Sequence, residues 1–429
     1  MSTLSSSTRP YIRCSAIALL TAAIGCPVGA QTFGNVVNVS DTTLDAGSLS
    51  VAVVSPNVNV VWRETGGKAL YSRSTNSGQT FSTPIQIFKV ATSGQGNPLV
   101  AATGSNVYVV RSASPKPNQP RQIFFKRSTN SGASFGNQVQ VSAASFGAGG
   151  ESMATSGASV YLCWLQRVGS YNDVFFARST NGGASFSAPV NLSNTPGDAQ
   201  DLVLAAEGSG VHVAWVEGTL PTREIFSIRS INNGASFGSV VNVSNSAAVD
   251  LGPAIAVSGP NVYLGWAEAE IRFAVSTDGG TTFSVPPVDL SVGGNVARPR
   301  LAASGSAVQV IWGSDSPGNY DIFHRASIDD GANFGVASNL SSSLTPSLDW
   351  FVAVNGANVS IAWAEDGEIF LVHSGNDGAT FGTAVNVSTS SGGSGGPTIT
   401  MPTPTEIHAT WLDSTPGNTD VFFSGSVEI

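Results

Sequence analysis

The stretch STNGGASF at residues 179–186 is one of seven related eight-residue segments in this chain of 429 residues. The segments recur about every 50 residues, a period typical of repeat architectures such as propellers. In every copy the third place is Asn or Asp, the fifth is Gly and the eighth is Phe. We call each segment a box, and the residues at its third and fifth places are Asn76, Gly78, Asn130, Gly132, Asn181, Gly183, Asn232, Gly234, Asp278, Gly280, Asp329, Gly331, Asn376 and Gly378.

The composition of the box indicates a tight turn between two strands. A third-place Asn or Asp can hydrogen-bond its own backbone two residues on, which forms an Asx-turn. The Gly can adopt the positive φ that a hairpin turn with a bulge requires. The Phe then begins the next strand and anchors the turn on the core. The predicted role of the box residues is therefore structural.

An apolar strand precedes each box, and in six of the seven cases it ends in Trp, as in VHVAW at residues 211–215. Apolar residues on both faces are expected for a strand sandwiched between neighbouring sheets. A Val/Ala-rich run comes before this strand and an aromatic strand follows it, so each unit contains four strands. There are eight such units; seven contain the Trp, and the second has Arg111 in its place.

The eighth box is split between the two ends of the chain. The last unit stops at Ile429, inside a box, whereas Gln31-Thr32-Phe33-Gly34 followed by VVNVS supplies a box end and an outer strand. We therefore predict an all-β fold: a single β-propeller of eight four-stranded blades over residues 31–429. The N-terminal strand would complete the last blade, so that no sheet edge stays open.

The first thirty residues have the pattern of an export signal, with Arg9 and Arg13 ahead of a short apolar stretch and Val28-Gly29-Ala30 at the expected cleavage site. Residues 1–30 are thus predicted to be a signal peptide and the protein to be secreted. A lipid anchor at Cys26 is the alternative. The apolar stretch is too short for a transmembrane segment.

Only 11% of the residues are charged, and the formal net charge is -9 without any basic run. This balance argues against nucleic acid as a partner. The four His residues show no metal-ligand spacing, so we expect neither a metal nor a cofactor, and we expect a monomer.

The boxes resemble the Asp boxes, or bacterial neuraminidase repeats, of the sialidase-like β-propellers. The resemblance covers the repeats of residues 31–429 and implies the propeller fold. Sialidases of this kind are expected to have six blades, three arginines that grip the substrate carboxylate, a Tyr nucleophile with a Glu partner, an Asp acid/base and an early Phe/Tyr-Arg-Ile-Pro motif. This sequence lacks that motif; its nearest string is Arg298-Pro299-Arg300-Leu301, in the sixth unit.

The boxes should lie on one face of the propeller and the more variable loops on the other, where binding sites usually evolve. Acidic residues follow the Trp strands on that loop face; they could bind a ligand or simply be solvated strand ends. Arginines there could grip a carboxylate or form local salt bridges. Trp350 lies outside the Trp register and could stack on a ligand. The predicted ligand-binding residues are Arg63, Arg111, Arg298, Arg300, Glu217, Glu268, Glu365 and Trp350.

Two functional hypotheses follow. The first is a secreted, non-catalytic binding or scaffold module that contacts glycans or extracellular surface proteins. The second is a sialidase-like exo-glycoside hydrolase, for which Tyr171 and Tyr320 are conceivable nucleophiles in matching loops. The uniform units and the missing motif favour the first hypothesis.

Overall fold

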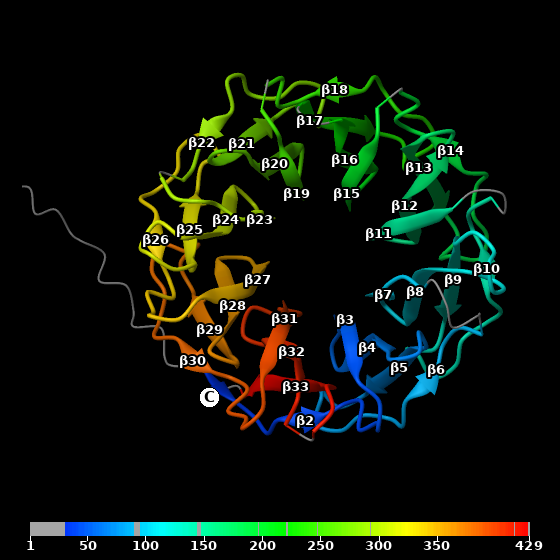
Figure 1. Ribbon diagram of the computed structural model, residues 1–429, viewed down its shortest axis with the longest axis vertical. Coiled ribbons are helices and arrows are strands. Elements are labelled where there is room, and N and C mark those ends of the chain that lie inside the picture. Colours follow the sequence, from blue (N-terminus) through cyan, green and yellow to red (C-terminus); the bar gives the residue numbers. More distant parts are fainter. Residues whose placement is uncertain are drawn as a thin grey trace, which may run out of the picture.

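The computed structural model describes residues 31–89, 95–143, 147–195, 197–219, 222–246, 248–291, 293–415 and 417–427. The predicted signal peptide, with Cys26, lies outside these residues. The described chain forms eight antiparallel sheets arranged as blades around a central axis, and it contains strands but no helix (Figure 1). The prediction of an eight-bladed β-propeller is confirmed.

The four strands of each blade run from the axis outward. The innermost strands are β3 (Ala46–Val54), β7 (Leu99–Thr103), β11 (Ala148–Ser156), β15 (Ala199–Glu207), β19 (Leu251–Ser258), β23 (Arg300–Ser304), β27 (Ser347–Asn355) and β31 (Ser394–Thr400). The second strands are β4 (Asn57–Glu64), β8 (Asn106–Ala113), β12 (Ser159–Val168), β16 (Gly210–Thr219), β20 (Asn261–Ala267), β24 (Ala307–Ser314), β28 (Asn358–Glu365) and β32 (His408–Asp413). The third strands are β5 (Ala69–Ser74), β9 (Gln122–Ser128), β13 (Tyr171–Ser179), β17 (Thr222–Ser230), β21 (Ile271–Ser276), β25 (Asp321–Ser327), β29 (Glu368–Ser374) and β33 (Asp420–Val427). The outer strands are β6 (Ile85–Gln86), β10 (Val139–Gln140), β14 (Val190–Asn191), β18 (Val241–Asn242), β22 (Val288–Asp289), β26 (Ser338–Asn339) and β30 (Val385–Asn386).

The N-terminal strands β1 (Thr32–Phe33) and β2 (Val37–Asn38) complete the eighth blade. Both pair antiparallel with β33, and Val37 lies opposite Phe423. Side chains reinforce this pairing, because Ser40 Oγ donates to Asp420 Oδ1 at 2.7 Å and accepts the Val421 amide at 2.8 Å. The ring is therefore closed by the N-terminal segment, as the split box predicted.

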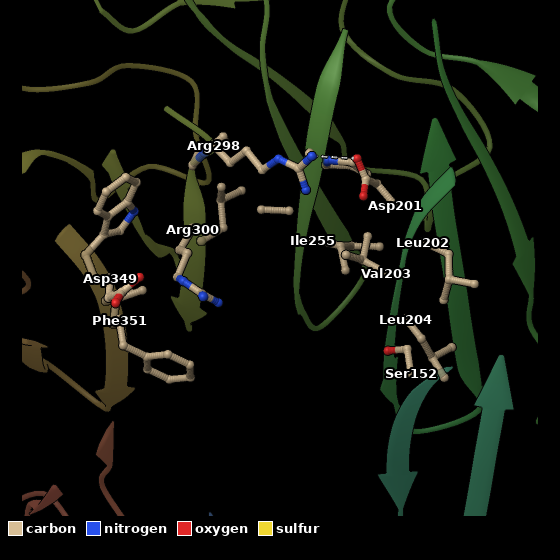
Figure 2. A pocket seen from close by; sticks show the side chains of 17 residues that line it. Ser152, Asp201, Leu202, Val203, Leu204, Ile255, Arg298, Arg300, Asp349 and Phe351 are labelled. Atoms are coloured by element: carbon tan, nitrogen blue, oxygen red, sulfur yellow. Dashed lines mark ion pairs between the residues drawn. The ribbon is translucent and has the colours of Figure 1, made fainter. Parts of the chain in front are cut away.

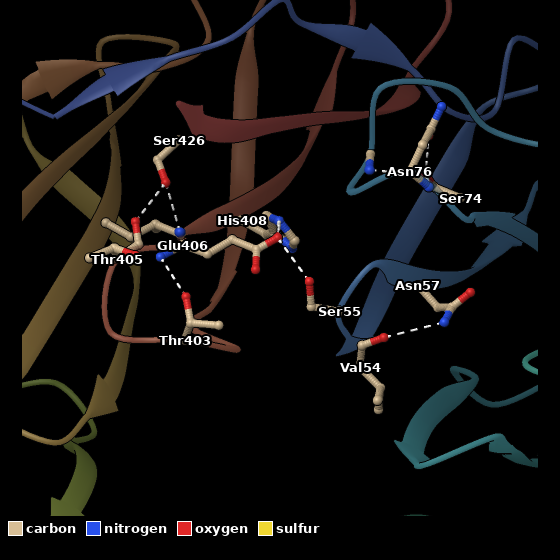
Figure 3. A network of polar contacts seen from close by, with 12 residues as sticks. Val54, Ser55, Asn57, Ser74, Asn76, Thr403, Thr405, Glu406, His408 and Ser426 are labelled. Carbon is tan, nitrogen blue, oxygen red and sulfur yellow. Dashed lines mark hydrogen bonds and ion pairs between the residues drawn. The ribbon is translucent and has the colours of Figure 1, made fainter. Parts of the chain in front are cut away.

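Polar contacts also join blade 8 to blade 1 on the box face (Figure 3). His408 Nε2 lies 2.9 Å from Glu406 Oε1, and Ser55 Oγ of blade 1 reaches the same carboxylate oxygen at 3.5 Å. Ser426 Oγ accepts the Ile407 amide at 2.8 Å. These contacts join the turn between β31 and β32 to the end of β33 and to blade 1.

The core lies between the blades. All seven tryptophans of the repeat are at most 1% exposed. Trp164 of β12, for example, packs with Tyr108, Val110 and Phe125 of the preceding blade and stacks on Phe175 of its own blade. Each blade thus buries its second strand against a neighbour, which makes stability a property of the closed ring.

The box turns differ in one respect from the sequence-based expectation. The third-place side chain does not bond the backbone two residues on; Asn181 Oδ1 instead accepts the Ser185 amide, four residues on, at 3.1 Å. Ser179 Oγ donates to the same oxygen at 2.8 Å and accepts the Gly183 amide at 2.9 Å. The hydrogen bond spans four residues rather than two because the residues at the fourth and fifth places both have positive φ, here 64° at Gly182 and 75° at Gly183.

Each box also docks on the blade before it. A Cβ on Gly183 would lie 2.7 Å from Phe125 Cζ of blade 2, so Gly is required for close approach as well as for its φ. Arginines that precede the first four boxes strengthen this contact: Arg127 Nη1, for instance, donates to the Gly182 carbonyl at 2.9 Å. Arg73, Arg178 and Arg229 make the equivalent bond to the following blade.

Candidate functional site

The innermost strands begin with an irregularity that brings polar side chains to the axis. In six blades the pairing register shifts near the start of this strand, and one residue there adopts positive φ. A bulge of this kind bends the strand and redirects a side chain. The six residues are Ser48, Gly150, Asp201, Gly252, Asp349 and Gly396.

A pocket of about 520 Å³ lies against the innermost strands of blades 3 to 7, and we call it the axial pocket. Leu202–Leu204, Ile255 and Leu301 supply its apolar lining. Its polar side chains stand at the ends of the same strands. In Figure 2, Arg298, Arg300 and Asp349 lie across the pocket from Ser152.

Arg298, two residues before β23, spans the pocket rim. Its Nη2 atom lies 2.9 Å from Asp201 Oδ2 of blade 4, although blade 5 stands between the two residues (Figure 2). The side chain crosses over Gly252, where a Cβ would come within 2.3 Å of Arg298 Cδ. The pair is solvent-accessible, with side-chain exposures of 58% and 31%, so it orients Arg298 more than it stabilises the fold.

Arg300, at the start of β23, presents its guanidinium to the pocket. The Cζ atom lies 5.0 Å from the centre of the Phe351 ring, within the range of a cation–π contact. Confinement among the inner strands lowers the pKa of Arg300, and the charge of Asp349 opposes that shift. Among the described residues no carboxylate lies within ion-pair distance of Arg300. The guanidinium of this exposed residue thus contacts the Phe351 ring and is free to bind a ligand.

Trp350 lies beside these residues on β27 and lines the pocket. Its six-membered ring packs over Gly313 of blade 6, where a Cβ would lie 2.7 Å from the indole Cη2 atom. The indole Nε1 is buried and has no hydrogen-bond partner among the residues that the structure describes. The structure thus brings Arg298, Arg300 and Trp350 together, as three of the eight predicted binding residues.

The predicted acidic residues are engaged locally instead. Glu217, only 7% exposed, accepts the Trp215 indole N–H at 2.7 Å, and Glu365 accepts that of Trp363 at 2.9 Å. Glu268 pairs with Arg272 at 2.6 Å. The structure does not place these three carboxylates in the axial pocket.

Arg63 and Arg111 lie on blades 1 and 2, also outside the axial pocket. Arg111 is fully buried and donates to the carbonyls of Gly67 at 3.2 Å and Gly96 at 3.1 Å. Burial lowers its pKa to about 10, which the charge of Glu151 opposes.

Three pocket residues escaped the sequence analysis: Asp201, Asp349 and Phe351. A signal for them exists, because charged residues interrupt runs that are otherwise rich in Val and Ala, as in AQDLVLAA and SLDWFVAV.

Neither Tyr171 nor Tyr320 lines the pocket. Within the described ranges, no cluster of His, Cys, Asp and Glu is arranged to hold a metal ion, and no helix could cross a membrane.

These features define an eight-bladed β-propeller with a ligand-sized pocket at its axis. No family model and no curated protein matches the chain. Among solved structures, an ulvan lyase bound to a GlcA(1-4)Rha3S chain is similar, with a TM-score of 0.53 at 9% identity over 83% of this chain and 98% of the lyase. A leech intramolecular trans-sialidase has a TM-score of 0.41 at 11% identity, over 92% of this chain and 94% of that one. A Hadza microbial sialidase has a TM-score of 0.40 at 12% identity, over 78% and 74%. Such low identities show the propeller fold alone.

Proposed function

We propose that this protein is an exported, non-catalytic binding module that holds an acidic glycan in the axial pocket. The single observation that carries the proposal is the arrangement of Arg300, which is fixed over the Phe351 ring yet free of any carboxylate partner among the described residues. A guanidinium held in this way can bind a carboxylate with two parallel hydrogen bonds.

The rest of the pocket suits a sugar. Carboxylates such as Asp349 can accept hydrogen bonds from ring hydroxyls, and the apolar wall of Leu204 and Ile255 can cover the C–H faces of a saccharide. The inner strands contact one another around the axis, so the site is built on rigid elements. The glycan-acting function of the ulvan lyase, which shares the fold, is in keeping with this proposal.

The carboxylates of the pocket are less suited to catalysis. Glycoside cleavage needs two carboxyl groups in different environments, one to donate a proton and one to attack or to activate water. Asp201 is neutralised by Arg298, and Asp349 Oδ2 accepts the Gly396 amide at 3.3 Å. Both carboxylates therefore serve to orient other groups.

A sialidase-like exo-glycoside hydrolase is the second proposal, because two arginines and two carboxylates converge on one pocket. The two proposals differ in one measurement, the hydrolysis of a panel of fluorogenic sialosides by purified protein. We expect no turnover above a buffer blank. Turnover that Arg300→Gln abolishes would establish the enzyme instead.

Binding is tested with a glycan array, followed by calorimetric titration of the best acidic oligosaccharide. Arg300→Gln should weaken its binding about tenfold or more, the contribution of a charge-assisted hydrogen bond. Arg167→Gln is the matched control, since this exposed arginine lies at the end of β12 away from the pocket. Equal affinities for the two variants would contradict the site.

Export is proposed from residues 1–30 alone. Sequencing the N-terminus of protein recovered outside the cytoplasm should give Gln31 as the first residue. Recovery of a chain that begins at a lipid-modified Cys26 would instead establish the anchored form.

A further inference from the structure

A second cavity, of about 420 Å³, lies where the loop-face ends of blades 1, 2 and 3 meet. Its lining includes Arg63 of β4, Ser112 of β8, Arg121 just before β9 and Glu151 of β11. It shares no lining residue with the axial pocket. We call it the blade 2 cavity.

A buried hydroxyl forms the floor of this cavity. Ser112 is fully buried, and its Oγ atom has no hydrogen-bond partner among the described residues. Gly96 packs directly against this hydroxyl, since a Cβ there would come within 2.1 Å of Ser112 Oγ. An unpartnered buried hydroxyl that lines a cavity is a polar group available to a ligand.

The walls of the cavity carry an excess of positive charge. Among the described residues, neither Arg63 nor Arg121 has a carboxylate within ion-pair distance. Arg111 lies behind them, fully buried, and holds the carbonyls of Gly67 and Gly96. The lining of the cavity thus contains two arginines, Arg63 and Arg121, and a single carboxyl group, that of Glu151.

Glu151 lies at the centre of this arrangement. Its Oε1 atom accepts the Ser112 amide, so the carboxyl group is fixed in orientation. Burial raises the pKa of Glu151, and the Ser112 amide, the neighbouring Ser112 side chain and the charge of Arg111 oppose that shift. In the protonated form the free carboxyl oxygen can donate a hydrogen bond into the cavity, whereas the ionised form would repel an anion.

We propose that the blade 2 cavity binds an oxyanion, a carboxylate or sulfate group, between Arg63 and Arg121, with the Ser112 hydroxyl as a further hydrogen-bond donor. The site is distinct from the axial pocket and does not depend on the function proposed for it. A ligand with two acidic groups that reaches both sites would be bound by arginines at two separate places.

The charge that acts on Glu151 is that of Arg111, and Arg63 and Arg121 line the same cavity. Because the bound anion prefers protonated Glu151, affinity should be highest below the pKa of that group and should fall as the pH rises through it. Replacing Glu151 by Gln keeps both the acceptor for Ser112 and a donor toward the cavity. The affinity of the Glu151→Gln variant for the anion should therefore depend less on pH than that of the wild type.

The test is calorimetric titration of the full chain with sodium sulfate and, separately, sodium acetate, which distinguishes the two kinds of oxyanion. Arg121→Gln and Arg63→Gln should each weaken binding about tenfold. Arg167→Gln should leave it unchanged, with folding of every variant checked by circular dichroism. Absence of binding of both anions, or equal binding by Arg121→Gln, Arg63→Gln and wild type, would each overturn the proposal.

Discussion

Arg298 and Asp201 form an ion pair at 2.9 Å although they belong to blades 6 and 4. The pair is made possible by Gly252 of the intervening blade, over which the arginine side chain lies. Arg300 stands two residues further along the chain, and both arginines line the axial pocket (Figure 2). The absence of a side chain at Gly252 thus shapes a pocket to which five blades contribute.

Gly252→Ala should displace Arg298 from Asp201 and weaken glycan binding in calorimetric titration. The variant also places a non-glycine residue at a φ of 54°, which costs about 1–2 kcal/mol of stability. Gly259→Ala is the matched control, because Gly259 has a φ of 58° and a Cβ there would meet no atom within 4 Å. The control should lose similar stability and keep its affinity; equal affinities for both variants would show that Arg298 does not contribute to binding.

Glu217→Ala should destabilise the protein by about 1–3 kcal/mol, because it leaves the buried Trp215 indole N–H without an acceptor. Glu217→Gln retains a side-chain acceptor and should cost less. Denaturant unfolding of the two variants measures the difference. If instead both variants unfold like wild type and lose ligand binding, the carboxylate contacts a ligand rather than the tryptophan.

Deletion of residues 31–40 should strongly destabilise the ring, since it removes β1, β2 and the Ser40 contacts with Asp420 and Val421. The outer edge of β33 would then be unpaired and free to pair with another chain. We expect a lower melting temperature and aggregation in size-exclusion chromatography. A truncated protein that stays monomeric and melts like the parent would contradict the role of closure in stability.

Gly183→Val should cost more than Gly157→Val in chemical denaturation. Both substitutions force a β-branched residue to positive φ, at a cost of order 1–3 kcal/mol. Only the first also drives a Cβ against Phe125 of the preceding blade, whereas Gly157 faces open space. Asn181→Ala, which removes two hydrogen bonds, should cost about 1–2 kcal/mol. Equal losses for the two valine variants would mean that the box does not dock on its neighbour.

Asp250→Asn should stabilise the protein near neutral pH and have little effect near pH 4. Asp250 is fully buried, and burial raises its pKa from 3.8 to about 6, with the Ser244 side chain opposing part of the shift. The folded state therefore keeps a proton that the unfolded chain has lost, so this contribution to stability is complete below about pH 4 and falls as the pH rises to about 6. The pKa shift corresponds to a free energy of unfolding that is lower at pH 7 than at low pH by roughly 3 kcal/mol.

Unfolding of wild type and Asp250→Asn in denaturant at several pH values measures this effect as a difference, in which the titration of other groups cancels. The stability gain of the variant should grow between about pH 4 and about pH 6 and then level off. A stability gain that does not change with pH would mean that the gain comes from packing and not from the titration of Asp250.

The sequence alone was sufficient for the architecture, because the information is local and repeated. Seven boxes with Gly at the fifth place, a Trp strand in each unit and a box split between the chain ends determine strand order, blade number and closure. These features depend on turn geometry and on which strands are buried, and both are encoded within about 50 residues. One detail of the turn was predicted wrongly. The side chain of Asn181 accepts the amide four residues on rather than two, because two consecutive residues have positive φ.

The sites were decided by the tertiary structure. Sequence patterns could name Arg298, Arg300 and Trp350, but only the tertiary structure places the two arginines beside Asp201, about a hundred residues away, and beside Asp349 of the next blade. The same holds for the blade 2 cavity, where Glu151 of one blade meets Ser112 of the next. The physical reason is that every blade presents the same inner-strand position to a shared axis, so side chains far apart in the chain become neighbours only through the ring.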